Sequence, residues 1–143
     1  MSRANVEVVR QVYEAAARHD TEEVLSLYDP DVEWVLAHHP RGEMFGGGST
    51  WGHEGLRAWF RAWYEAFDDF EHKCEELIDA GEHVVSVGTD RGRGRESGVQ
   101  VEQEVAAVWT VRDGKVVRVV WWPSREEALE AVGLREDHSL TDE

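Results

Sequence analysis

Residues 101–122 read VEQEVAAVWTVRDGKVVRVVWW, and this stretch decides the fold. Apolar and polar side chains alternate along its first half, which is the period-two pattern of a strand with one buried face. The Asp113-Gly114 pair predicts a tight hairpin, because both residues tolerate positive φ. Residues 115–122 therefore return as a second, antiparallel strand.

Two more strands are expected before this hairpin. Residues 72–79 and 84–95 favour strands, and the Ala80-Gly81 pair between them predicts a turn. Ser97-Gly98 predicts the turn into the long strand, which begins at residue 99. The sequence thus predicts a four-stranded antiparallel meander.

Three helices are expected before the meander. Apolar residues recur at helical spacing over residues 5–18, and Asp20 followed by Glu23 predicts the capped start of a short second helix. A strand is expected over residues 31–36, followed by a long loop over residues 37–52. A third helix with an aromatic buried face is predicted by apolar residues spaced three and four apart: Leu56, Trp59, Phe60, Trp63, Phe67 and Phe70.

The end of the chain completes an α+β layout. Ser124 followed by Glu127 predicts a capped short helix that Gly133 ends. A curved, mostly antiparallel sheet packed against three N-terminal helices, with a short C-terminal helix, forms a cone whose unfilled wide end is a pocket. We expect one domain over residues 1–143 with an ordered core over about residues 4–134, because a chain of this length suits a single core.

The charge balance excludes several classes of partner. Thirty Asp and Glu residues against 15 Lys and Arg residues give a net charge of −15, which repels nucleic acid and anionic membrane surfaces. No run approaches the roughly 18 apolar residues that a membrane span needs. Cys74 is the single cysteine, so an internal disulfide has no second partner. We therefore expect a cytoplasmic protein that binds neither nucleic acid nor membranes.

Segments spread over residues 5–134 resemble the nuclear transport factor 2-like (NTF2-like) superfamily, and within it the SnoaL-like proteins. The resemblance is found in VVRQVYEAAARHD (8–20), LYDPDVEW (27–34), WGHEGLRAWFRAWYEAF (51–67), EELIDAGEHVVSVGTDRGRGRESG (75–98), VWTVRDGKVVRVVWW (108–122) and REEALEAVGL (125–134). It implies an NTF2-like cone. The activity stays open, because this fold hosts isomerases, cyclases, hydrolases, dehydratases and non-catalytic binding modules.

Ketosteroid isomerase-like members of the superfamily suggest one set of site residues. In these proteins a tyrosine on the first helix and an acid on the long strand donate hydrogen bonds to an enolate, and an aspartate on the first strand moves the proton. Tyr13 stands at the tyrosine position, whereas Trp34 and Ala107 stand at the base and acid positions. The resemblance therefore implies a donor at Tyr13 and disfavours steroid-type isomerisation.

Two other reactions of the superfamily stay open as alternatives. Polyketide cyclases of the SnoaL type close a ring by aldol chemistry, with an acid/base pair and with neither metal nor cofactor. Limonene-epoxide-hydrolase-like members use an Asp-Arg-Asp set, for which this chain offers Asp90 and Arg91. Neighbours on a strand point to opposite faces, however, which disfavours a shared role for these two residues.

Strand parity predicts which side chains face the pocket. The inward rows are expected to be Gln103, Val105, Ala107 and Trp109 on the long strand, Val117, Val119 and Trp121 on the last strand, and Val85, Val87, Thr89 and Arg91 on the strand before. The Gln103 amide is expected either to orient a carbonyl or hydroxyl group of a ligand or to lie solvated at the rim. The Arg91 guanidinium is expected either to bind an anionic oxygen or to belong to a solvated hairpin tip.

His38 is the predicted proton-transfer residue, with Tyr13 as its partner in catalysis. His38 and His39 follow the first strand where it reaches the mouth of the cone, and an imidazole titrates near neutral pH. The alternative is a histidine on a surface loop. We expect no metal and no cofactor, because the only conceivable ligand set (His38, His39, His53 and Glu43) lacks the spacing of known metal motifs.

Tryptophan is abundant, with seven residues in the chain. Five of them are expected either to line a flat apolar cavity that stacks a polycyclic ligand or to fill the cone completely: Trp34, Trp59, Trp63, Trp109 and Trp121. Val120 and Trp122 are expected on the opposite face of the last strand. Exposed aromatic surface on a sheet predicts a covering subunit, hence a homodimer through this outer face.

Together these features predict a protein that binds a hydrophobic, oxygenated small molecule in the cone pocket, as a cofactor-independent cyclase or isomerase. A non-catalytic ligand-binding or dimeric accessory module is the first alternative, motivated by the missing acid and base positions. An epoxide hydrolase of the limonene-epoxide-hydrolase type is the second.

Overall fold

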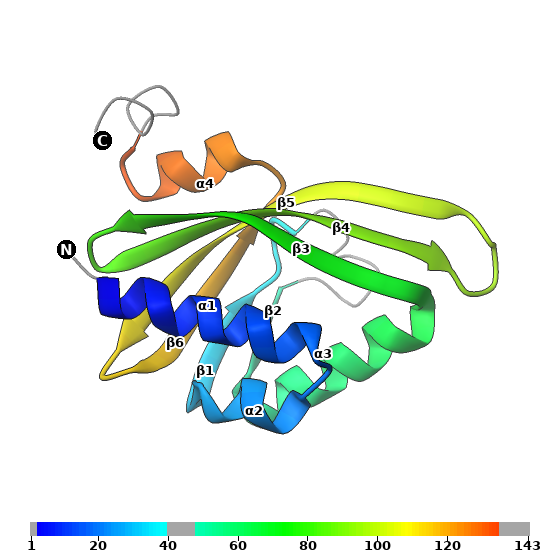
Figure 1. The fold of residues 1–143 in the computed structure, drawn as a ribbon, viewed down its shortest axis with the longest axis horizontal. Helices are drawn as coiled ribbons and strands as arrows, with labels where there is room; N and C mark the ends of the chain where they lie inside the picture. Colours follow the sequence, from blue (N-terminus) through cyan, green and yellow to red (C-terminus); the bar gives the residue numbers. More distant parts are fainter. Residues whose placement is uncertain (1–2, 40–47, 135–143) are drawn as a thin grey trace.

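The computed structural model describes residues 3–39 and 48–134. Helices α1 (Arg3–Ala17) and α2 (Thr21–Ser26) come first, followed by β1 (Tyr28–Val35), β2 (Ser49–Trp51) and α3 (Gly52–Ala66). The remaining elements are β3 (Phe67–Ala80), β4 (His83–Gly94), β5 (Gln100–Arg112), β6 (Lys115–Trp122) and α4 (Arg125–Ala131), as Figure 1 shows. The predicted α+β layout and antiparallel meander are confirmed.

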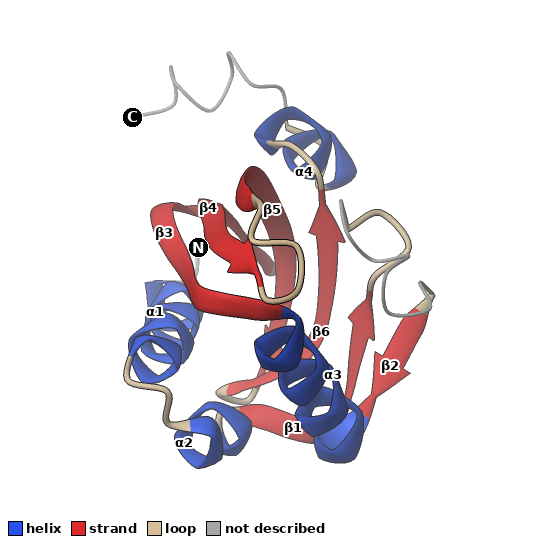
Figure 2. Ribbon diagram, turned by 90° about the vertical axis from the view of Figure 1, so that its right-hand side faces the viewer, coloured by secondary structure: helices blue, strands red, loops and turns tan. Residues whose placement is uncertain are grey.

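One curved sheet organises the described chain, with strand order β2-β1-β6-β5-β4-β3. Every pairing is antiparallel except that of β1 with β6, which is parallel. Helices α1, α2 and α3 lie on one side of the sheet and α4 lies on the other (Figure 2). Within the two described ranges, no helix is long and apolar enough to cross a membrane.

The hairpin turn and the helix cap form where the sequence predicts them. Asp113 and Gly114 have φ values of 53° and 78°, and Arg112 pairs with Lys115 across the turn. The Ser124 hydroxyl accepts a hydrogen bond from the Glu127 amide at 3.2 Å and so begins α4. These local choices fix the hairpin register and the end of the last strand, and the register in turn fixes which side chains face inward.

Both faces of the sheet are buried around β4 and β5. The inner apolar cluster packs against α1 and α3 and includes Val84, Val105, Ala107, Trp109 and Trp121. The outer cluster is covered by α4 and consists of Val85, Val87, Ala106, Val108, Ala128 and Leu129. Hydrophobicity therefore does not distinguish the two faces of β4, where residues 84 to 88 are all buried.

The predicted inward row of β4 was wrong, because both faces of this strand are buried. Val85 and Val87 lie in the outer cluster rather than in the cone. The inner row of β4 follows from its pairing with the inward row of β5, which joins Val84 to Trp109, Ser86 to Ala107, Gly88 to Val105 and Asp90 to Gln103. On β6 a register irregularity near Val111 places Val116, rather than Val117, in the inner cluster. Two polar residues of β4, Ser86 and Asp90, thus face the cone.

Two predicted element boundaries were also wrong. Helix α3 ends at Ala66, because Phe67 already has extended φ and ψ values of −129° and 139°. The rings of Phe67 and Phe70 still contact Trp63 from the start of β3, with centroids 5.1 Å and 5.2 Å away, so their spacing imitated a longer helix. The expected loop over residues 37–52 contains β2, which pairs with β1 through Trp34 and Thr50.

The outer face differs from the exposed surface on which the homodimer was predicted. Trp122 is half-buried against the outer cluster under α4. The His38 imidazole stacks on the Trp122 ring with a centroid separation of 4.3 Å and an interplanar angle of 2°. Trp122 is therefore covered by its own chain, and the homodimer stays a prediction.

Candidate functional site

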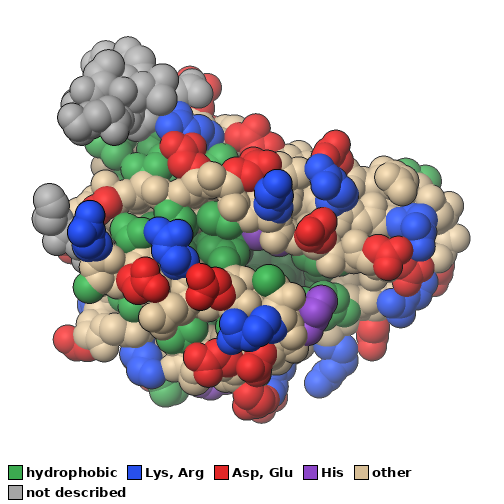
Figure 3. Space-filling view, viewed as in Figure 1, with side chains coloured by type: hydrophobic (Ala, Val, Ile, Leu, Met, Phe, Trp, Pro, Cys, Tyr) green, Lys and Arg blue, Asp and Glu red, His purple; other side chains and the backbone are tan. Residues whose placement is uncertain are grey.

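A cavity of about 910 Å³ lies between the inner face of the sheet and helices α1 and α3. Figure 3 shows the hollow near the middle of this face, with apolar side chains inside it and charged side chains around it. Its lining includes all five tryptophans that the sequence indicated: Trp34, Trp59, Trp63, Trp109 and Trp121. The indole rings thus form walls and leave the cone unfilled, with room for a drug-sized ligand.

The aromatic walls hold one another in place. Trp34 meets Trp121 and Trp59 edge to face, with centroid separations of 5.4 Å and 6.0 Å. Trp59 and Trp63 lie one turn apart on α3 and stack at 5.2 Å. Such pairs add stabilisation beyond the area that they bury, so the shape of the cavity is largely set before a ligand enters.

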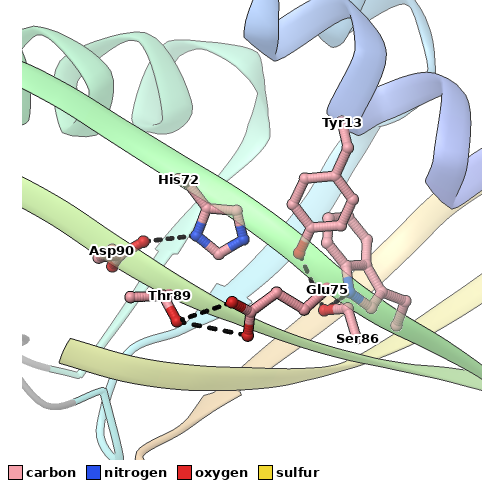
Figure 4. A network of polar contacts seen from close by, with 7 residues as sticks. Tyr13, His72, Glu75, Ser86, Thr89 and Asp90 are labelled. Atoms are coloured by element: carbon pink, nitrogen blue, oxygen red, sulfur yellow. Dashed lines mark hydrogen bonds and ion pairs between the residues drawn. The ribbon is translucent and has the colours of Figure 1, made fainter. Parts of the chain in front are cut away.

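His72 and Asp90 form a largely buried polar pair on the wall of this cavity. They are directly opposed on β3 and β4, which brings their side chains together on the inner face. His72 Nδ1 donates a hydrogen bond to the Asp90 carboxylate, and Figure 4 shows the imidazole between that carboxylate and the Tyr13 ring. Asp90 is only 7% exposed, so its acceptor oxygens are shielded from water.

The second ring nitrogen of His72, Nε2, is the one available to a ligand. A carboxylate only accepts hydrogen bonds, so Asp90 keeps the proton of His72 on Nδ1 and leaves Nε2 with its lone pair. Nε2 is buried and finds no hydrogen-bond partner in the part of the chain that the structure describes. A neighbouring carboxylate also stabilises the imidazolium that forms when Nε2 takes a proton. The pair therefore has the arrangement of an oriented general base.

A β-bulge selects His72 for this position. The register of β3 with β4 shifts between Cys74 and Glu76, so that Glu75 has no direct partner. If the register set at the turn continued without the shift, Asp90 would oppose Lys73 instead of His72. Gly88 makes the close approach of the two strands feasible, because a Cβ there would lie 2.3 Å from the Lys73 carbonyl oxygen.

Tyr13 is held against the base by a second hydrogen-bonded chain. Its ring stacks on the His72 imidazole, with centroids 5.0 Å apart and planes at 8°. Trp109 Nε1 donates to Ser86 Oγ at 2.8 Å, and Ser86 Oγ lies 2.9 Å from the Tyr13 hydroxyl oxygen. When the serine proton points to Tyr13, the phenol proton is free to point toward a ligand.

Burial keeps Tyr13 protonated. Desolvation raises the pKa of its phenol well above the ordinary value of 10.0, and the Cys74 thiol nearby acts in the same direction. Burial also raises the pKa of Tyr28, which lines the same cavity. Tyr13 is thus a neutral hydrogen-bond donor at any physiological pH.

The raised tyrosine pKa values predict a loss of stability at alkaline pH. Above about pH 10 the unfolded chain ionises Tyr13 and Tyr28 while the folded chain keeps both protons, so the free energy of unfolding falls as pH rises. Each tyrosine contributes up to about 1.4 kcal/mol per pH unit. Urea unfolding of Tyr13→Phe from pH 10 to 11.5 should show a slope smaller by about that amount, and a slope equal to that of the wild type would contradict the assignment.

The other predicted ligand-binding residues lie in different places. Ala107 is fully buried in the inner row, where it pairs with Ser86 and Trp121. Gln103 is half-buried opposite Asp90 but does not line the cavity. Arg91 points away from it and forms an exposed ion pair with Glu102, at 3.0 Å from Nε to the carboxylate. The expected inward position of Arg91 was therefore wrong, because the parity of β4 is the reverse of the one predicted.

Of the two histidines after β1, His39 lines the cavity and the predicted proton-transfer residue His38 does not. His38 lies outside the cavity, with its exposed ring on Trp122. The chain turns at this point through a hydrogen bond from the His39 amide to the Leu36 carbonyl, so consecutive side chains diverge. His39 lines the cavity, and its ring meets Trp59 and Trp121 edge to face.

The alternative metal and epoxide arrangements can be compared with these positions. Glu43 lies outside the described residues, and His53 Nε2 lies 3.0 Å from the Tyr28 carbonyl oxygen. Across residues 3–39 and 48–134, no group of three His, Cys, Asp or Glu residues is placed to hold a metal ion. Asp90 and Arg91 lie on opposite faces of β4, as the parity argument against the epoxide arrangement predicted.

Comparison with known proteins places this arrangement in context. A family model described as the SnoaL-like domain matches residues 9–119. A search of curated proteins finds no match.

Solved structures share the whole fold. An NTF2-like protein of unknown function from Burkholderia pseudomallei K96243 is 28% identical, with a TM-score of 0.75, and the match covers 93% of this chain and 99% of that chain. An NTF2-like protein from Burkholderia thailandensis E264 is 31% identical, with a TM-score of 0.73 and coverage of 82% and 88%. TerC, co-crystallized with polyporic acid, is 28% identical, with a TM-score of 0.73 and coverage of 90% and 98%. The predicted NTF2-like cone is confirmed.

Proposed function

Because this chain belongs to the SnoaL-like domain family, we propose that it binds a hydrophobic, oxygenated small molecule in the aromatic cavity and moves a proton of that molecule with His72. The observation that supports this most strongly is the largely buried His72–Asp90 pair, whose Nε2 atom has no partner among the described residues and lies in a cavity walled by aromatic rings. Asp90 orients the base, and Tyr13 supplies a neutral donor beside it.

The reaction class follows from these three groups. Nε2 removes a proton from a carbon or oxygen next to a carbonyl group, and the Asp90 carboxylate stabilises the resulting imidazolium. The Tyr13 hydroxyl stabilises the negative charge that develops on the carbonyl oxygen. Returning the proton to another atom completes an isomerisation, and attack of the enolate on a second carbonyl of the same molecule closes a ring. The chain's own residues supply each proton transfer, in line with a cofactor-independent enzyme.

This proposal differs from the ketosteroid isomerase arrangement in the origin of the base. The positions that would carry the base and the acid in that arrangement hold Trp34 and Ala107, which have no group that titrates. His72 and Asp90 reach the cavity from β3 and β4 instead. An altered position of the base suits a different substrate or a different position of the abstracted proton.

One similar solved structure, that of TerC, supports an aromatic, oxygen-bearing ligand. TerC was co-crystallized with polyporic acid, and its similarity to this chain covers 90% of this chain. Polyporic acid is a dihydroxyquinone with two phenyl groups, and walls of indole rings suit flat aromatic and quinone rings of this kind. We propose that a ligand of this general kind occupies the cavity.

The proton-transfer step can be tested with 5-nitrobenzisoxazole, a flat aromatic carbon acid. When a base removes its C–H proton, the N–O bond breaks and a coloured cyanophenolate forms. We expect the protein to open this ring faster than an equal concentration of free imidazole, and polyporic acid to inhibit competitively. A rate no higher than that of imidazole, together with binding of polyporic acid, would favour the non-catalytic binding module.

A further inference from the structure

Among the buried polar atoms of the cavity lining that lack a hydrogen-bond partner within the described residues, which include Trp34 Nε1, two lie on neighbouring rings and together describe what a ligand must offer. Trp121 Nε1 and His72 Nε2 are both buried, and neither contacts a hydrogen-bonding atom within the described ranges. Trp121 is 8% exposed and lines the same cavity as His72. Buried polar groups are almost always hydrogen-bonded in folded proteins. Two buried polar atoms without a partner among the described residues at one site therefore indicate that a ligand supplies their hydrogen-bond partners.

The two atoms belong to neighbouring rings. The Trp121 and His72 rings meet edge to face at 84°, with centroids 6.2 Å apart. A single small group of a ligand can therefore reach both rings.

The chemistry of the two atoms differs. An indole N–H only donates a hydrogen bond, so Trp121 needs an acceptor such as a carbonyl oxygen. Nε2 of an imidazole whose Nδ1 donates to Asp90 accepts a proton, so His72 needs an acidic O–H group. The ligand must place an acceptor oxygen and an acidic oxygen close together on a flat apolar frame.

We infer that the ligand is a vinylogous acid, either a hydroxyquinone or an enolised 1,3-dicarbonyl compound, that binds through Trp121 and His72. Its carbonyl oxygen accepts a hydrogen bond from Trp121 Nε1. In the bound pair an enolate oxygen lies beside an imidazolium. His72 Nε2 takes the hydroxyl proton of the ligand or, when the ligand arrives already ionised, one proton from the buffer. The delocalised charge of such an anion is less costly to bury between indole rings than the localised charge of a carboxylate.

This inference rests on the proposed function and adds a specificity-determining residue, Trp121. It can be tested by calorimetric titration with 2-hydroxy-1,4-naphthoquinone and with its 2-methoxy ether. Both ligands carry the carbonyl oxygen, and only the first carries the acidic hydroxyl. We expect the wild-type protein to bind the hydroxy compound about tenfold more tightly or better, because a charge-assisted hydrogen bond is stronger than a neutral one.

Three variants separate the two contacts. Trp121→Phe keeps an aromatic ring and removes the N–H, so both ligands should bind roughly 5- to 10-fold more weakly with their ratio unchanged. His72→Gln should reduce the preference for the hydroxy compound to about threefold or less, since the base is gone. Trp122→Phe is the matched control, because its indole lies in the outer cluster, and it should change neither affinity.

The outcomes distinguish the two claims. If Trp121→Phe binds both ligands as tightly as the wild type while His72→Gln loses the preference, the role of Trp121 is refuted and the proposed function stands. If His72→Gln keeps the full preference, or if neither ligand binds, the proposed function fails as well. A measurement on the wild-type protein tests the contact even if a variant folds poorly. The NMR resonance of the Trp121 indole N–H should move downfield when either ligand binds. A resonance that does not move in the bound state refutes the contact.

Discussion

His72→Gln should lower the rate of ring opening of 5-nitrobenzisoxazole by about 10²- to 10⁴-fold, the usual contribution of a positioned general base. The glutamine amide can still donate a hydrogen bond to the Asp90 carboxylate, so the burial of that charge is not left uncompensated. The variant has no lone pair on nitrogen with which to take a proton. The rate constant should therefore fall far more than the affinity for the probe.

The matched control for this variant is His38→Gln. His38 has the same side chain, but it follows β1 and its ring stacks on Trp122 outside the cavity. Its removal should leave the rate within about twofold of the wild type, since a change at an exposed site rarely exceeds about 0.5 kcal/mol. Equal losses in the two variants, or a full rate in His72→Gln, would remove His72 from the proposed mechanism.

Trp109→Ala should lower the free energy of unfolding by about 3–5 kcal/mol, the usual cost of removing a large core side chain. Trp109 is 1% exposed and contacts the rings of Tyr13, Tyr28 and Trp121. Its removal also takes away the donor that orients Ser86. Because a domain of this size is stabilised by only about 5–15 kcal/mol, the transition in urea should shift to a much lower midpoint.

Trp109→Phe separates packing from hydrogen bonding. The phenyl ring keeps most of the apolar contact, and Ser86 keeps its contact with the Tyr13 hydroxyl. We expect a loss clearly smaller than that of Trp109→Ala, of the order of 1–2 kcal/mol. A loss below about 1 kcal/mol in the alanine variant would contradict the role of Trp109 as the centre of the inner cluster.

The fold was largely predictable because several local signals agree. The alternation of residues 101–111, the Asp113-Gly114 turn and the Ser124 cap each fix one element, and their order leaves few topologies. The end of α3 was harder to predict, because Phe67 and Phe70 keep the helical spacing while they lie on a strand. Their rings contact Trp63 in either conformation, so the hydrophobic pattern does not distinguish the two.

The aromatic walls were predictable, and the base was not. Trp109 and Trp121 follow from the parity of their strands, which have one face toward the helices. The strand β4 is buried on both faces, so the positions of its valines did not show which face points into the cone. Its polar residues Ser86 and Asp90 were therefore assigned to the wrong face. Two polar residues spaced by four in an apolar strand were the signal that was missed.

The position of His72 depends on a feature that composition does not reveal. Counting back from the Ala80-Gly81 turn pairs Asp90 with Lys73, and only the bulge at Glu75 brings His72 opposite the carboxylate. The position of His39 in the cavity in place of His38 has a similar cause, since one turn after β1 decides which imidazole enters the cavity. Single-residue shifts of register decide the chemistry of this site while the fold stays the same.

The proposed mechanism requires His72 Nε2 to be the proton acceptor of the cavity. The ¹⁵N NMR signals of the imidazole rings report its protonation directly, when they are followed during a titration with 2-hydroxy-1,4-naphthoquinone. We expect His72 Nε2 to carry no proton in the free protein and to gain one on saturation, with no change of protonation at any other histidine. A ligand that binds while His72 Nε2 stays unprotonated, or that protonates a different histidine, would contradict it.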